Sequence, residues 1–137
     1  MRNLRTFAVC FLGAIAMAAC AGSESIEGNK NTLTEKGYTV SVYSAEEYKT
    51  QPVAKIFSEP TGLTNHLVAA KTTQEKNYVF AAWYFASIDQ ANNWEKANEA
   101  KLASFYSETA GTTLGQRNNV VWIGTGETAD ILGWRTI

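Results

Sequence analysis

The sequence predicts an α+β domain in which helices pack on one face of an antiparallel sheet, as a two-layer sandwich. Two observations lead to this prediction. Segments that alternate between apolar and polar residues, as half-buried strands do, are followed by capping-box sequences that begin helices. The stretch 77–87 is apolar on both of its faces. A strand of that kind belongs in the middle of a sheet, where neither face meets water.

The first strand is expected at residues 38–43, which alternate and are rich in β-branched and aromatic residues. Ser44 and Glu47 follow it as a capping box, whose side chains bind the free amides at a helix start. Pro52 should kink or split this helix because it has no amide hydrogen and crowds the preceding turn. The helix should end at residues 59–62. The side chains expected to face the core from it are Tyr48, Val53, Ile56 and Phe57.

The next two strands are expected at residues 66–72 and 77–87, joined as a hairpin by the polar connector 73–76. Residues 67–70 leave an alternative open, because this short apolar run is also compatible with a helix and hence with a three-layer fold. The second strand has two apolar faces: Tyr78, Phe80, Ala82 and Tyr84 on one, and Val79, Ala81, Trp83 and Phe85 on the other.

A second capping box at residues 87–90 begins a helix that we expect to run to about Thr109 and to be stopped by Gly111. Its apolar stripe is Ala91, Trp94, Leu102 and Phe105. The remaining expected elements are a turn at residues 115–119, a last strand at 120–123 and a short helix at 127–132. This order is that of a ferredoxin-like βαββαβ two-layer sandwich with a short C-terminal helix. In that fold the first and third strands are central and both long helices lie on one face.

The N-terminus has the parts of a secretory signal: Arg2 and Arg5, an apolar run over residues 7–16, and small residues before Cys20. In this arrangement the sequence resembles a bacterial lipoprotein precursor, whose signal ends in the cysteine that receives the lipid. The resemblance implies cleavage before Cys20, acylation of Cys20, and a location at the bacterial cell membrane or outer membrane with the domain outside the cytoplasm. The alternatives are a plain secretory signal with an ordinary residue at Cys20, or a thiol that later forms a disulfide.

We therefore expect three regions: a signal peptide at residues 1–19, a lipidated N-terminus with a flexible tether at 20–32, and a single domain at 33–137. Cleavage would leave 118 residues with 10 basic and 13 acidic side chains, a net charge of −3. Since nucleic acid demands a basic stripe, nucleic acid is not an expected partner. The only other cysteine, Cys10, lies in the signal, so no disulfide and no thiolate chemistry is expected in the domain.

Few residues are candidates for chemistry. His66 is the only histidine, and no nucleophile motif lies near it; we interpret it as an ordinary histidine at a strand edge. The sequence 124–129 matches the dinucleotide pattern G-x-G-x-x-A, but too few residues follow it for a second strand with its acid. We interpret it as a strand-to-helix turn capped by Thr125, with weak anion binding as the alternative. No cofactor and no metal are expected.

A two-layer sandwich leaves one sheet face open, yet the central strand is apolar on both faces. Either the C-terminal segment with Ile131, Leu132 and Trp134 covers that face, or the face binds a second copy, an envelope protein or a small ligand. The residues assigned to this candidate binding face are Tyr43, Tyr78, Phe80 and Tyr84. The expected function is thus a non-enzymatic, lipid-anchored binding module. The alternative is a small envelope enzyme that uses His66 or a tyrosine as acid or base.

Overall fold

The computed structural model describes residues 25–105 and 111–134 of the chain. Within these residues it is an α+β fold around one antiparallel sheet, so the predicted class is confirmed. The strands in chain order are β2 (Thr39–Ser44), β3 (Leu63–Thr72), β4 (Asn77–Phe85), β5 (Thr112–Arg117) and β6 (Val120–Thr125). In space the order is β2-β3-β4-β6-β5, which places β4 in the middle and β2 and β5 at the edges.

This strand order is not the ferredoxin-like one. The third predicted strand is central, as expected, but the first lies at an edge and pairs with β3. The other edge is β5, which the sequence does not predict: residues 112–117 pair with β6, although 115–117 belong to the predicted turn at 115–119. The chain reverses at Asn118, whose φ is 54°. This strand was missed in the sequence because Gly115 is typical of a turn and is rare inside a strand. The sheet needs glycine there, because a Cβ would lie 2.4 Å from the ring of Trp122.

Several local predictions are confirmed. Ser44 Oγ accepts from the amide of Glu47 at 3.1 Å, and the Glu47 carboxylate accepts from the amide of Ser44 at 2.8 Å. The helix that this capping box begins, α2 (Ala45–Tyr48), is a single turn, and a 3-10 helix, η2 (Pro52–Lys55), starts anew at the proline. Residues 67–70 are strand, and the hairpin register runs from Thr72 paired with Asn77.

The second predicted helix is broken at Asn98 into α3 (Ile88–Ala97) and α4 (Glu99–Ala103). The Asn98 amide explains the break: its oxygen accepts from the amide of Ser58 at 2.9 Å and its nitrogen donates to Ser58 Oγ at 2.9 Å. A continuous helix to Thr109 is therefore wrong, and residues 106–110 lie outside the described residues. Phe105 is 48% exposed and Ile56 40%, so neither faces the core as predicted.

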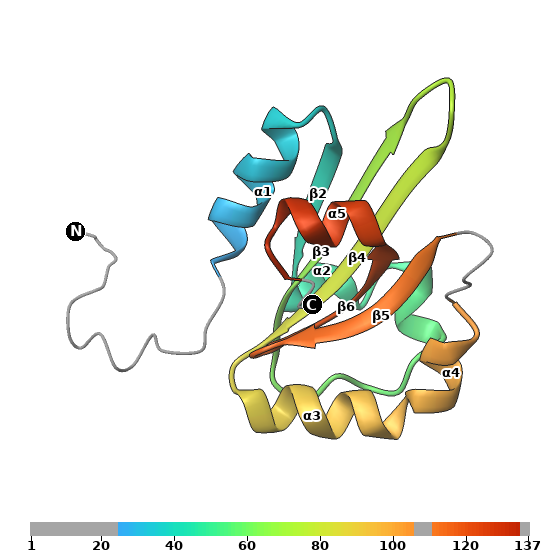
Figure 1. The fold of residues 1–137 in the computed structure, drawn as a ribbon. Helices are drawn as coiled ribbons and strands as arrows, with labels where there is room; N and C mark the ends of the chain where they lie inside the picture. The colour runs from blue at the N-terminus through green and yellow to red at the C-terminus, as the bar shows by residue number, and fades with distance from the viewer. Residues whose placement is uncertain (1–24, 106–110, 135–137) are drawn as a thin grey trace, which may run out of the picture.

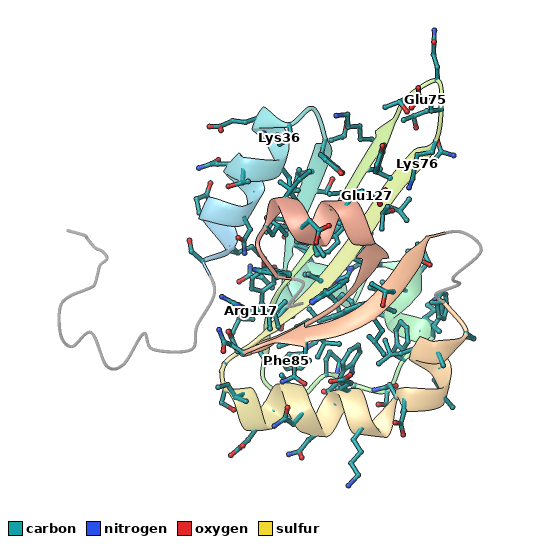
Figure 2. All side chains as sticks on the ribbon, viewed as in Figure 1. Lys36, Glu75, Lys76, Phe85, Arg117 and Glu127 are labelled. Atoms are coloured by element: carbon teal, nitrogen blue, oxygen red, sulfur yellow. The ribbon has the colours of Figure 1, made fainter. Side chains whose placement is uncertain are left out.

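Helices cover both faces of the sheet, so the molecule has three layers rather than two. Figure 1 shows α1 (Ile26–Glu35) and α5 (Gly126–Ile131) on one side and α3 and α4 on the other. The first side buries a cluster that includes Leu67, Phe80, Tyr84, Trp122 and Trp134. The second side buries Tyr48, Phe57, Trp83, Phe85, Trp94 and Leu102. In Figure 2, Lys76 from the β3–β4 hairpin meets Glu127 of α5, with 3.0 Å between Nζ and the carboxylate.

Helix α1 corrects the predicted tether, which is wrong over residues 26–32. Ser25 caps this helix by accepting from the amide of Gly28 at 3.1 Å. Leu33 is fully buried, and Asn29 Nδ2 donates to the hydroxyl of Tyr84 at 2.8 Å. A mostly polar segment is thus held on the sheet by the buried Leu33, by the half-buried Ile26 and by the hydrogen bond from Asn29 to Tyr84. Residues 20–24 lie outside the described residues.

Candidate functional site

The predicted aromatic binding face is not an open surface. Phe80 and Tyr84 are 3% and 2% exposed, and Trp134 packs on both, with ring centroids 5.6 and 6.3 Å away. Tyr78 is half-buried edge-to-face against Tyr38. Tyr43 lies on the opposite face of the sheet, stacked on His66. The structure therefore brings three of the four residues to one face and covers it with α1 and the C-terminal segment, the alternative that involved Ile131, Leu132 and Trp134.

Cys20, the predicted site of lipid attachment, lies outside the described residues. In residues 25–105 and 111–134, no helix is long and apolar enough to cross a membrane.

His66 lies inside β3 and is surrounded by aromatic rings, whereas the sequence placed it at the edge of a strand. It is 1% exposed, and the rings of Trp83, Tyr48 and Tyr43 surround it at centroid distances of 4.8, 5.0 and 6.2 Å. Its Nδ1 donates to the carbonyl of Ala82 at 2.9 Å, which fixes the tautomer with Nε2 unprotonated. Burial lowers the pKa of His66 to about 4, against a smaller opposing effect of that hydrogen bond.

This environment indicates that His66 has a structural role. A general base needs access to substrate and a pKa near the working pH, and His66 has neither. The neighbouring Tyr48 is 1% exposed as a residue, and its hydroxyl accepts from Trp83 Nε1 at 3.2 Å. Burial raises the pKa of Tyr48. Among the described residues, no three His, Cys, Asp or Glu side chains are grouped to hold a metal ion.

The G-x-G-x-x-A sequence is a tight turn from β6 into α5. Thr125 occupies the N-cap position, but its hydroxyl makes no capping bond and accepts instead from the amide of Val79 at 2.9 Å. The amide of Gly126 donates to the carbonyl of Gly111 at 3.2 Å. Thr125, Gly126 and Thr128 are all buried. One of the amides at this helix start, that of Gly126, is therefore already bonded within the fold.

An apolar groove lies on the face of the sheet that carries α2, η2, α3 and α4. It has a volume of about 330 Å³, within the range of small-ligand pockets. Two of its residues, Val79 and Phe105, are large apolar side chains that stand 46% and 48% exposed. The residues that line it are Val53, Phe57, Val68, Ala69, Val79, Phe80, Ala81, Trp83, Phe105 and Ile123.

The groove exists because the helices on this face are shorter than the strands beneath them. β3 and β4 have ten and nine residues and so extend about 30 Å, whereas the ten residues of α3 extend about 15 Å. The breaks at Pro52 and Asn98 shorten the helical cover further. Trp83 and Phe85 are covered, while Val79 and Ala81, further toward the hairpin, are not.

Our sequence interpretation missed this groove, because it placed the whole Val79 face against the helices. The one usable signal was Pro52, which limits the first helix to a turn. The break at Asn98 could not be foreseen, since it depends on Ser58, forty residues away.

A larger hollow of about 610 Å³ lies between α2 and the segment 59–63. Its charged residues are Lys49 and Glu59, both exposed. Lys49 forms a surface ion pair with Glu46 at 3.2 Å. Tyr48, which also lines the hollow, already accepts a hydrogen bond from Trp83. The described polar side chains of this hollow are exposed or already bonded within the fold, so the apolar groove is the better candidate site.

Comparisons of the chain with protein-family models, with curated proteins and with solved structures gave no match.

Proposed function

We propose that this chain is a lipid-anchored protein of the bacterial envelope whose folded domain binds an apolar group in the groove over β3 and β4. The anchor is Cys20, acylated after removal of residues 1–19. The domain works outside the cytoplasm, on the inner or the outer membrane, as a binding module and not as an enzyme.

The observation that carries the binding proposal is the uncovered apolar surface of the middle strand. Val79 and Phe105 are large apolar side chains that stand 46% and 48% exposed, and an exposed apolar patch on a folded domain often marks a binding site. Both line a concave groove of ligand size. The enzyme alternative has less support, because His66 and the Tyr48 hydroxyl are both buried.

The anchor is tested by Cys20→Ala. We expect the unchanged chain to incorporate labelled palmitate and to partition into detergent, and the variant to do neither, because two or more acyl chains are needed for firm membrane attachment. Cys10→Ala is the matched control and should behave as the unchanged chain. Palmitate in the Cys20→Ala protein would overturn the lipid-anchor proposal.

The groove is tested with the fluorescent apolar probe N-phenyl-1-naphthylamine and the chain from residue 20 onward carrying Cys20→Ala, which keeps every described residue. We expect saturable binding that Val79→Lys weakens at least tenfold by placing a charge in the groove. Ile88→Lys is the matched control, because Ile88 is 43% exposed but does not line the groove. Equal binding by both variants would contradict the site.

A further inference from the structure

The hydrogen-bonding capacity of the groove limits what can bind there. Among the described residues that line the groove, none has a charged side chain, and the indole nitrogen of Trp83 is the only polar side-chain atom. That nitrogen already donates to the hydroxyl of Tyr48 at 3.2 Å. A ligand group with donors or acceptors would lose its bonds to water and find no side-chain partner in return. The part of the ligand that enters the groove is therefore apolar.

The size of the groove argues against a protein partner. Ten of the described residues line it, whereas a stable protein interface takes about 20–30 residues from each side. The groove is also open at Val79 and Phe105, so a bound molecule can extend from it into water. A slender apolar chain with a polar end outside the groove meets both conditions.

We infer that the ligand is the acyl chain of a fatty acid or lipid, bound along Val79, Ala81 and Phe105 with its head group in water. This inference rests on the proposed function, since it assigns a ligand class to the same groove. The inference leads to two separate predictions about affinity. Affinity depends on the length of the chain, by roughly fourfold for each methylene that enters the groove. Affinity does not depend on the charge of the head group, because none of the described residues that line the groove carries a charge.

The experiment is displacement of N-phenyl-1-naphthylamine from the Cys20→Ala chain used above, with competitors kept below their micelle concentrations. Octanoate, decanoate and dodecanoate test chain length. Dodecanol and dodecyltrimethylammonium, compared with dodecanoate, test the head group. We expect affinity to rise from octanoate to decanoate, to level off once the groove is filled, and to stay within about threefold across the three dodecyl heads.

Ala81→Leu tests the placement, because the larger side chain projects into the groove from a half-buried position on β4. We expect it to shorten the chain length at which affinity levels off, while Ile88→Lys leaves the series unchanged. Thermal melting of each variant shows that it remains folded. Should Ala81→Leu unfold the domain, Val79→Lys serves in its place and is expected to abolish the dependence on chain length.

The outcomes separate the two proposals. Probe bound in the groove but displaced by none of the acyl compounds would overturn the acyl-chain inference, leave the proposed function standing and point to apolar side chains of a protein. Displacement that follows head charge and not chain length would also overturn it. Failure of the probe to bind at all would overturn both proposals.

Discussion

The imidazole of His66 is held neutral by burial among aromatic rings, and this sets how the domain responds to acid. The folded protein has a His66 pKa of about 4, while the unfolded chain has the ordinary value of 6.5. Between these values the unfolded state binds more protons, so the free energy of unfolding falls as the pH falls. The stability is present above pH 6.5 and is lost progressively down to about pH 4.

We predict that the protonation of His66 on unfolding lowers the free energy of unfolding by about 3 kcal/mol between pH 7 and pH 4. Urea unfolding across this range, compared with His66→Phe, isolates the effect. The comparison is needed because Glu95, whose pKa is raised by burial and by Glu99, titrates with the opposite sign. His66→Phe should flatten the pH dependence, and an unchanged slope in the variant would show that His66 is not responsible.

Trp83 and Tyr84 are neighbours in β4 that point to opposite faces and are each 2% exposed. Since both side chains are covered within the monomer, we predict that Trp83→Ala and Tyr84→Ala each lower the free energy of unfolding by about 3–5 kcal/mol. Ile88→Ala, at a 43% exposed position, should cost far less. A Tyr84→Ala protein that kept full stability in urea would mean that α1 and the C-terminal segment do not close that face.

At the scale of elements, α1 is the clearest departure from what the sequence predicts. Its polar composition reads as a linker, yet Leu33 is fully buried and Asn29 bonds to Tyr84. We predict that Leu33→Ala lowers the free energy of unfolding by about 2–4 kcal/mol, whereas Glu35→Ala, on the exposed side, has little effect. Equal urea midpoints for these two variants would favour a loose tether.

Local signals in the sequence were sufficient for most elements. The capping box at Ser44, the interruption at Pro52 and the hairpin around residues 73–76 each depend on side chains within a few residues of one another. The failures involve partners far apart in the chain. Asn98 breaks a helix by bonding to Ser58, and Gly115 sits in a strand because the Trp122 ring covers it. No window along the sequence contains both members of such a pair.

The same reasoning explains the outcome for the site. The sequence indicated correctly that the middle strand is apolar on both faces. The sequence could not indicate which part of the sheet stays uncovered, because the uncovered part is set by where the helices end in space. The open surface is the hairpin end of the Val79 face, opposite the face to which Phe80 and Tyr84 belong.

At the scale of the whole molecule, α1 and α5 cover the face of the sheet that carries Tyr84, so no second copy of the chain is needed to bury that face. We predict that residues 25–137 are a monomer whose mass by light scattering does not change with concentration. Removing α1 in a chain of residues 37–137 should expose Leu67, Tyr84 and their neighbours, and an apolar patch of this kind promotes association. We therefore expect the shorter chain to unfold at a lower urea concentration and its apparent mass to rise with protein concentration.

If the shorter chain were as stable and as monomeric as the longer one, α5 and Trp134 would be sufficient to cover the face, and α1 would serve another purpose.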